Sequence, residues 1–169
     1  MQFSSPQVLL SIIIPAFEDP QCLKECITSI QQQKHSDTEI IVVNDGGSHE
    51  LEILINEMRQ SWPELNLSYF YQKNLGPGPA RTVAAKMAKG EYLLPLDSDD
   101  LLVPDSMEKL NEDLLKHPET DFLYGDYQCF GDSEDRLTFG PLNLEELNFR
   151  NTLPNSSVQR RKLYLEVGG

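Results

Sequence analysis

Short apolar runs alternate with stretches of helical periodicity along the first two-thirds of the chain. The runs are dense in aliphatic and β-branched residues, as in VLLSIIIP and EIIVV, and strongly polar residues gather at their ends. Continuous runs of this kind are typical of parallel strands that are covered on both faces. The pattern predicts four such strands, over residues 8–15, 39–43, 67–71 and 91–96.

Helices are predicted between these strands. Leu23, Ile27 and Ile30 have the spacing of one apolar helix face. Strands that alternate with helices indicate an α/β fold, a three-layer sandwich in which helices flank a mostly parallel central sheet. Further helices are predicted over 51–62, within 76–89 after a Gly/Pro-rich turn, and from Pro104 and Asp105 onward, with Leu110, Leu114 and Leu115 facing inward.

The pattern changes after residue 121. FLYGDYQCFG and RLTFGPL predict shorter strands that form a hairpin, residues 144–149 a brief helix, and residues 158–167 a last strand followed by a helix. Neither a repeat nor a linker divides the sequence, so residues 1–169 are expected to form a single domain.

Four polar segments follow the predicted strands. In open α/β sheets, ligands bind beyond the carboxyl ends of the strands, so these segments are expected to lie together. They are residues 15–19, 44–48, 74–81 and 97–100, each rich in polar residues, glycine or proline. This convergence predicts one ligand site at one edge of the sheet.

Composition narrows the classes of function. The chain has 14 basic and 27 acidic residues, a formal charge of -13, which argues against nucleic acid as a partner. A phosphate ligand would then need local cations or a metal. The three cysteines do not form a zinc set and are expected to be reduced thiols. Because no signal peptide or spanning run is visible, a cytoplasmic location is the default expectation.

The acidic cluster formed by Asp97, Ser98, Asp99 and Asp100 follows the fourth predicted strand. Carboxylates this close repel one another unless a cation compensates their charge. A hard divalent ion with oxygen ligands, Mn²⁺ or Mg²⁺, is the natural partner, and it could support a leaving diphosphate as a Lewis acid. The alternative is a solvated acidic loop that caps the next helix.

Two other interpretations of the acidic cluster can be judged from the neighbouring residues and from its position in the chain. An EF-hand loop is rejected, because Leu101 and Leu102 occupy positions that require an oxygen ligand and a glycine. LLPLDSDDL also resembles the motif of haloacid-dehalogenase-type phosphatases, with Asp97 as the nucleophile. That motif normally opens the fold, whereas three strand-helix units precede it in this chain.

Asp45 and its neighbours offer contacts for a base or a sugar. Its carboxylate could accept a hydrogen bond from a uracil N–H or a ribose hydroxyl, and the alternative is a helix cap or a turn. Phe17 could place a ring, and Glu18 a carboxylate, near a base, although core packing is the alternative for Phe17.

The segment NLGPGPAR resembles a phosphate loop only weakly, since it matches neither a Walker sequence nor a dinucleotide fingerprint. Its glycines, Gly76 among them, could let the backbone approach a ligand, Asn74 is a further candidate contact, and Arg81 could pair with a phosphate beside a helix N-terminus. The alternative is a helix-opening turn in which Arg81 makes a structural ion pair.

Taken in order, these segments resemble family 2 glycosyltransferases with the GT-A fold. SIIIPAFED, EIIVVNDGGS and NLGPGPARTVAAKMAKGEYLLPLDSDD carry the resemblance over nearly the whole chain. It implies transfer of a sugar from a nucleoside-diphosphate sugar, UDP-linked in the first instance, to a glycan, lipid or protein acceptor. The implied site has Pro15, Phe17 and Asp45 around uridine, Arg81 near the diphosphate, Asp97 on ribose or sugar, and Asp99 on the metal with support from Asp100.

The sequence departs from the family pattern at Phe17, Asn44, Gly47 and Thr82, where Tyr, Asp, Ser and Asn are usual. RRKLYLEVGG resembles the segment that precedes the family's catalytic-base motif. The expectation is therefore a donor domain that ends at Gly169, before the general base, binds donor and metal, and transfers sugar poorly. A non-catalytic nucleotide-sugar-binding module is the alternative, and association of a longer protein with the inner face of a membrane is compatible with either.

Overall fold

The central sheet has six strands in the order β3-β2-β1-β4-β8-β5. The computed structural model describes residues 10–33, 38–147 and 153–169. β1 pairs in parallel with β2 and β4, and β2 with β3, whereas β8 is antiparallel to both β4 and β5. The predicted α/β fold with a mostly parallel sheet is confirmed. The strands are β1 (Leu10–Ala16), β2 (Thr38–Asp45), β3 (Asn66–Gln72), β4 (Tyr92–Pro95), β5 (Phe122–Leu123) and β8 (Val158–Arg160).

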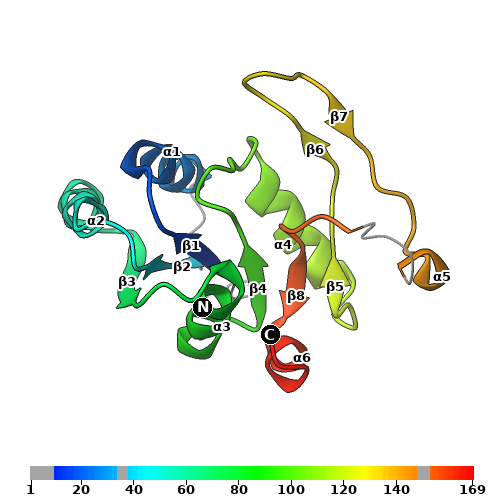
Figure 1. Ribbon diagram of the computed structural model, residues 1–169. Helices are drawn as coiled ribbons and strands as arrows, with labels where there is room; N and C mark the ends of the chain where they lie inside the picture. Colours follow the sequence, from blue (N-terminus) through cyan, green and yellow to red (C-terminus); the bar gives the residue numbers. More distant parts are fainter. Residues whose placement is uncertain (1–9, 34–37, 148–152) are drawn as a thin grey trace, which may run out of the picture.

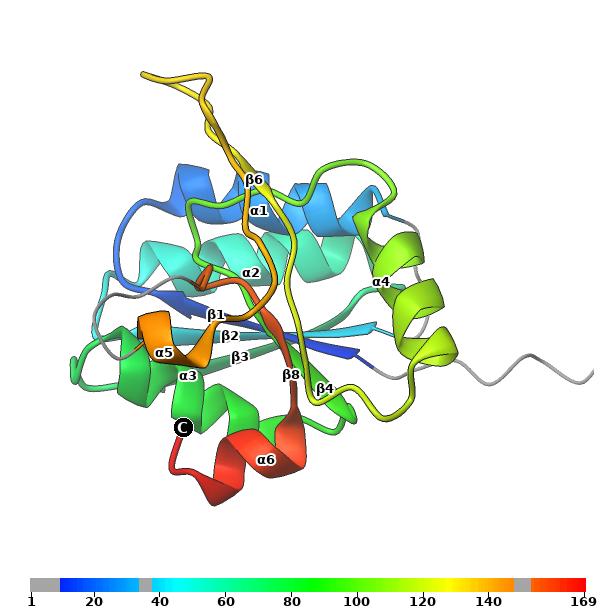
Figure 2. The same ribbon diagram turned by 90° about the vertical axis from the view of Figure 1, so that its right-hand side faces the viewer.

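Helices cover both faces of the sheet (Figures 1 and 2). Alternate residues of β1 point to opposite faces, so Ile12 and Ile14 belong to one core cluster and Ile13 to the other. The first cluster includes buried residues of α1, α2 and α4, and the second includes residues of α3 and α6. The helices are α1 (Pro20–Gln31), α2 (Glu50–Ser61), α3 (Pro77–Met87), α4 (Ser106–Lys116), α5 (Leu144–Leu147) and α6 (Arg161–Glu166).

The predicted apolar face of α4 is wrong at one position. Leu114 is buried and Leu110 packs against the first core cluster, but Leu115 is exposed. Adjacent residues on a helix lie about 100° apart, and in α4 the direction of the sheet is taken by Leu114, which leaves Leu115 turned toward solvent. Residues 8 and 9 of the first predicted strand lie outside the described residues.

The predicted hairpin is present but smaller than expected. β6 (Tyr127–Gln128) pairs with β7 (Arg136–Leu137) and projects from the body of the molecule (Figure 1). Phe122 and Leu123 do not belong to it, because they form β5 at the edge of the central sheet and pair with β8. The hairpin prediction was therefore too broad at its start. The predicted helix over 144–149 extends beyond α5 into residues outside the described ranges.

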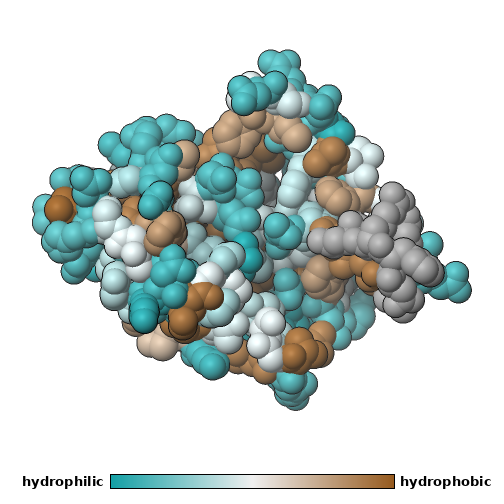
Figure 3. All heavy atoms as spheres, in the orientation of Figure 1, coloured by the Kyte–Doolittle hydropathy of each residue, from teal (hydrophilic) through white to brown (hydrophobic). Residues whose placement is uncertain are grey.

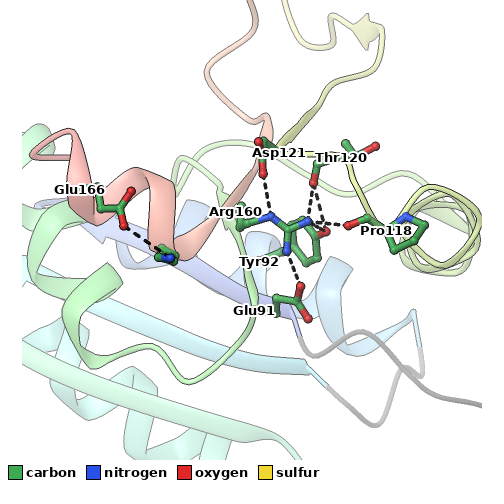
Figure 4. Close-up of polar contacts among 8 residues, drawn as sticks. Glu91, Tyr92, Pro118, Thr120, Asp121, Arg160 and Glu166 are labelled. Carbon is green, nitrogen blue, oxygen red and sulfur yellow. Dashed lines mark hydrogen bonds and ion pairs between the residues drawn. The ribbon is translucent and has the colours of Figure 1, made fainter.

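Arg160, the last residue of β8, connects this strand to β4 and to the segment before β5 (Figure 4). Its guanidinium forms ion pairs with Asp121 and Glu91 and lies 4.7 Å from the centre of the Tyr92 ring. It also donates to the Tyr92 hydroxyl and to the Pro118 carbonyl, at 2.6 and 2.7 Å. This contact set joins the end of β8 to the start of β4 and to the segment before β5.

The helices of the described ranges are too short or too polar to cross a membrane.

Candidate nucleotide-sugar site

The loops after β1, β2 and β3 pack against one another at the carboxyl edge of the sheet. A Cβ added to Gly47 would lie 1.4 Å from the Phe17 carbonyl oxygen, and one added to Gly46 would lie 2.6 Å from the Asn74 nitrogen. Gly46 also has a φ of 80°, which other residues rarely adopt. These glycines allow three of the four predicted polar segments to meet. Figure 3 views the molecule from this edge, where hydrophilic residues separate several hydrophobic patches.

Asp45 holds the loop before α3. Its Oδ1 accepts hydrogen bonds from the Leu75 amide at 2.9 Å and from Gln72 Nε2 at 2.7 Å, and its Oδ2 accepts from the Gly76 amide at 2.7 Å. Gly76 is the N-cap of α3 and has no side chain to cap it. Asp45 therefore holds the turn that leads into α3 from a different strand, a contact that local sequence could not predict.

The end of β2 also holds its own turn. The side chain of Asn44 accepts from the Gly47 amide at 2.6 Å and donates to the Tyr69 hydroxyl at 2.9 Å. Asn44 stands where the family commonly has Asp, and its amide can donate as well as accept, which a carboxylate cannot. The neighbouring Gln72 has a buried Oε1 for which the described residues supply no donor.

Arg81 and Asp97 form an ion pair between α3 and the end of β4. Both side chains are largely buried, at 21% and 31% exposure, so the pair is less screened than a surface pair. The buried Nε of Arg81 has no acceptor within the described ranges. Arg81 is thus an ion-pair residue inside the site.

The backbone of the acidic cluster is anchored to α1. The Asp100 amide donates to the Asp97 carbonyl at 3.0 Å, which closes a turn, and the Cys26 thiol lies 3.7 Å from the same carbonyl. The Leu102 amide donates to the Ser29 hydroxyl at 3.0 Å. Burial and the nearby carboxylates strongly raise the pKa of the Cys26 thiol, so it is neutral and structural.

The carboxylates of the acidic cluster have different surroundings. Asp99 is exposed, whereas Asp97 and Asp100 are half-buried. Burial raises the pKa of Asp100, the charges of Asp97 and Asp99 raise it further, and a hydrogen bond from Ser156 opposes them. The carboxylates therefore carry more negative charge than Arg81 alone balances.

This imbalance fits a divalent cation. The available donors are hard carboxylate oxygens, the ligands that Mg²⁺ and Mn²⁺ prefer. Among the described residues, no three His, Cys, Asp or Glu side chains already form a metal-binding group. A cation held by one or two of these carboxylates would therefore need oxygens from a ligand such as a diphosphate to complete its shell.

The remaining predicted site residues differ in accessibility. Phe17 is 43% exposed at the carboxyl edge, so core packing is the wrong interpretation of it. Glu18 and Asn74 are exposed and Ser98 is half-buried, whereas Pro15 is buried within β1. The geometry leaves Phe17, Glu18 and Asn74 free to meet a ligand and gives Pro15 a place in the strand.

Three residues that were not predicted from the sequence contact the site. Gln72 binds Asp45, Ser156 binds Asp100 at 3.4 Å, and the Tyr127 hydroxyl accepts from the Ser156 amide at 2.6 Å. Gln72 follows a predicted strand and could have been found by its position at the carboxyl edge. Ser156 could not, because it lies 56 residues from Asp100 and no local pattern marks it.

A mostly parallel sheet with polar loops and an acidic cluster at its carboxyl edge is typical of α/β proteins that bind a ligand at that edge. The family model described as "Glycosyl transferase family 2" matches residues 11–165, and the chain belongs to this family. The chain is similar to an uncharacterized glycosyltransferase of Haemophilus influenzae, with 26% identity over 169 aligned residues. The match covers 95% of this chain. The chain spans 56% of that relative's length.

Solved structures support the GT-A fold. The structure of Staphylococcus aureus TarS in complex with UDP-GlcNAc matches with a TM-score of 0.73 and 23% identity, over 94% of this chain and 47% of that one. Mannosyltransferase PcManGT of Pyrobaculum calidifontis, in complex with GDP-Man and Mn²⁺, matches with a TM-score of 0.68 and 17% identity. That match covers 98% of this chain and 48% of the other.

Proposed function

We propose that this chain binds a nucleoside-diphosphate sugar, UDP-linked, together with Mn²⁺ or Mg²⁺, as the donor domain of a glycosyltransferase. The observation that carries this proposal is the meeting of Asp45, Arg81 and the acidic cluster at one edge of the sheet. Family membership supports the reaction class, and the match argues against the Asp-nucleophile phosphatase. TarS with UDP-GlcNAc and PcManGT with GDP-Man and Mn²⁺ support the ligand class.

The base and ribose would bind over the ends of β1 to β3. Phe17 is exposed there, and the buried Oε1 of Gln72 can accept a hydrogen bond from an N–H group. Asp45 already accepts three hydrogen bonds, and a carboxylate has about four acceptor sites, so one remains on Oδ2. These acceptors suit the N–H edge of a uracil.

The diphosphate would lie between α3 and the acidic cluster. Arg81 keeps a buried donor, Nε, and holds the carboxylate of Asp97 in place. Asp99, with Asp97 and Asp100 beside it, would hold the metal. The bound cation would supply charge stabilisation for the departing diphosphate. The chain's own role is to orient the donor so that the sugar carbon is presented to an acceptor hydroxyl.

Titration calorimetry with UDP tests this proposal, once with Mn²⁺ and once with EDTA. We expect UDP binding that depends on Mn²⁺ and is weakened at least about tenfold in Asp99→Asn, because a direct ligand is lost. GDP titrated in parallel tests the choice of base. Absence of UDP and GDP binding in the presence of either metal would overturn the proposal.

Asp105→Asn is the matched control. Asp105 is exposed, as Asp99 is, and lies near the acidic cluster, but it precedes α4 in a left-handed conformation that Asn also accepts. We expect its UDP affinity to equal that of the unchanged protein. An equal loss in both variants would mean that net charge, rather than ligation at Asp99, controls binding.

Transfer to an acceptor separates an enzyme from a non-catalytic binding module. Release of UDP from UDP-sugars, measured with and without candidate acceptors, is the assay. The identity of the acceptor stays a prediction.

A further inference from the structure

Two carboxylates of the acidic cluster are held by different parts of the chain. Asp97 pairs with Arg81 of α3, within the region that carries the donor loops. Asp100 instead accepts a hydrogen bond from the Ser156 hydroxyl, and the distance between Ser156 Oγ and Asp100 Oδ2 is 3.4 Å. Ser156 belongs to the segment that enters β8. The acidic cluster therefore has one face toward the early strands and another toward the C-terminal segment.

Ser156 is itself held from two directions. Its amide donates to the Tyr127 hydroxyl at 2.6 Å, which ties it to the base of the hairpin. The next residue, Ser157, is fully buried and donates its hydroxyl to the Pro154 carbonyl at 2.6 Å, which closes a turn. These contacts leave Ser156 little freedom to move away from Asp100.

The register of β8 adds a third restraint. Gln159 pairs with Leu93 and Arg160 with Tyr92, so β8 lies directly beside β4, the strand that leads into the acidic cluster. The contacts of Arg160 with Glu91 and Asp121 keep that register (Figure 4). Figure 1 shows β8 next to β4, with the segment before β8 passing toward the hairpin side of the molecule.

We propose that Ser156 is a positioning residue that orients the Asp100 carboxylate for the metal–diphosphate complex, with Tyr127 holding the Ser156 backbone. This inference rests on the proposed function. A hydroxyl that donates to one carboxylate oxygen restricts the rotation of the group and leaves the other oxygen available to a cation or its bound water. Groups that support metal-binding side chains in this way typically change metal affinity about 10- to 100-fold when they are removed.

The consequence is that the donor site is completed by the C-terminal segment. The loops of β1 to β4 supply the residues that would touch nucleotide and metal, and the turn before β8 supplies the support for one of them. Through Tyr127, the hairpin becomes part of the same support.

Ser156→Ala tests the proposal directly. The expected result is a loss of about tenfold in Mn²⁺-dependent UDP affinity by calorimetry, the lower end of the range because the contact is long. Electron paramagnetic resonance of free Mn²⁺ in the presence of UDP should show the same weakening. Residual UDP binding in EDTA should not change, since the hydroxyl acts on the carboxylate and not on the nucleotide. Tyr127→Phe should show a smaller loss in the same direction.

Ser106→Ala is the matched control, because that half-buried serine donates to the Val103 carbonyl and not to a carboxylate. Its Mn²⁺ affinity should be unchanged, and Ser156→Thr, which keeps the hydroxyl, should recover most of the lost affinity. Thermal unfolding confirms that each variant is folded.

Unchanged affinity in Ser156→Ala, or equal losses in the Ala and Thr variants, overturns the role of the hydroxyl while leaving the proposed function intact. If the unchanged protein binds neither Mn²⁺ nor UDP, both the role of Ser156 and the proposed function are overturned.

Discussion

The four early strands and the C-terminal segment are held together in different ways. β1 to β4 are nearly completely buried except for β3, and their loops are packed so closely that two glycines have no room for a side chain. From β5 onward the strands are two or three residues long, and the hairpin strand β7 is exposed. Specific polar contacts, such as those of Arg160, take the place of buried area there.

The two regions are therefore stabilised by different kinds of contact. The early region depends on backbone shape and apolar packing, which tolerate almost no added volume. The late region depends on a few side chains that connect residues distant in sequence. The acidic cluster lies where the two regions meet, with Asp97 held by the first and Asp100 by the second.

Gly47→Ala should have the largest effect, because it breaks the packing of the early region. The new Cβ would lie 1.4 Å from the Phe17 carbonyl oxygen, so both loops must move. We expect the free energy of unfolding to fall by about 3 kcal/mol, as for severe overpacking. Denaturant unfolding measures it. Gly78→Ala is the control, because nothing lies within 4 Å of its added Cβ, and it should be neutral or slightly stabilising.

Arg160→Met tests the late region and should have an intermediate effect. It removes the ion pairs with Asp121 and Glu91 but keeps a side chain of similar length. The expected loss is about 2 kcal/mol, because hydrogen bonds to charged groups are strong but partly screened here. Hydrogen exchange should show the amides of β8 opening more readily than those of β1. If β1 and β8 lose protection equally, the two regions do not differ as described.

Arg136→Met is the control for Arg160. Its pair with Asp126 lies on the exposed hairpin, where Arg136 is 67% exposed. The free energy of unfolding should change little, because solvent screens an exposed pair.

Asp100→Asn should have a smaller effect than Gly47→Ala and Arg160→Met, and one of the opposite sign. The folded-state pKa of Asp100 is raised by burial and by the neighbouring carboxylates. Its protonated form is therefore favoured in the native state, and stability falls as pH rises above about 4, through the folded pKa. In EDTA at pH 7 the variant should be more stable by about 0.5 kcal/mol, a value discounted for partial exposure. Thermal unfolding from acidic to neutral pH measures it.

Adding Mn²⁺ and UDP sharpens the same test. The unchanged protein should gain more stability than Asp100→Asn, because the cation offsets the repulsion that the variant lacks. A variant that is less stable than the unchanged protein at pH 7 in EDTA would contradict the cause given for the pKa shift.

Most of the early region could be predicted from the sequence. Short apolar runs rich in β-branched residues, alternating with helices, favour a parallel sheet covered on both faces, and the chain direction then collects their polar ends. The prediction was weaker where a pattern is short. Phe122 and Leu123 form an edge strand of the central sheet, although their sequence suits the neighbouring hairpin equally well. Leu115 faces solvent although it is as apolar as Leu114.

Within the candidate site, the sequence identified the residues but not their partners. Arg81 was equally compatible with a phosphate contact and a structural ion pair, and the structure pairs it with Asp97. Asp45 was expected to bind a ligand or to cap a helix or turn, and in the structure it accepts hydrogen bonds from the Leu75 and Gly76 amides just before α3. Such contacts depend on the distance between segments after folding, which residue type alone does not encode.

The sequence by itself determined the α/β alternation, the polar edge of the sheet and the acidic cluster, because periodicity and residue type are local properties. Only the tertiary structure decided which carboxylate meets Arg81, which one meets Ser156, and that β8 runs antiparallel beside β4. Those outcomes depend on packing between segments that are tens of residues apart, where small differences in shape and hydrogen bonding select one partner among several of similar chemistry.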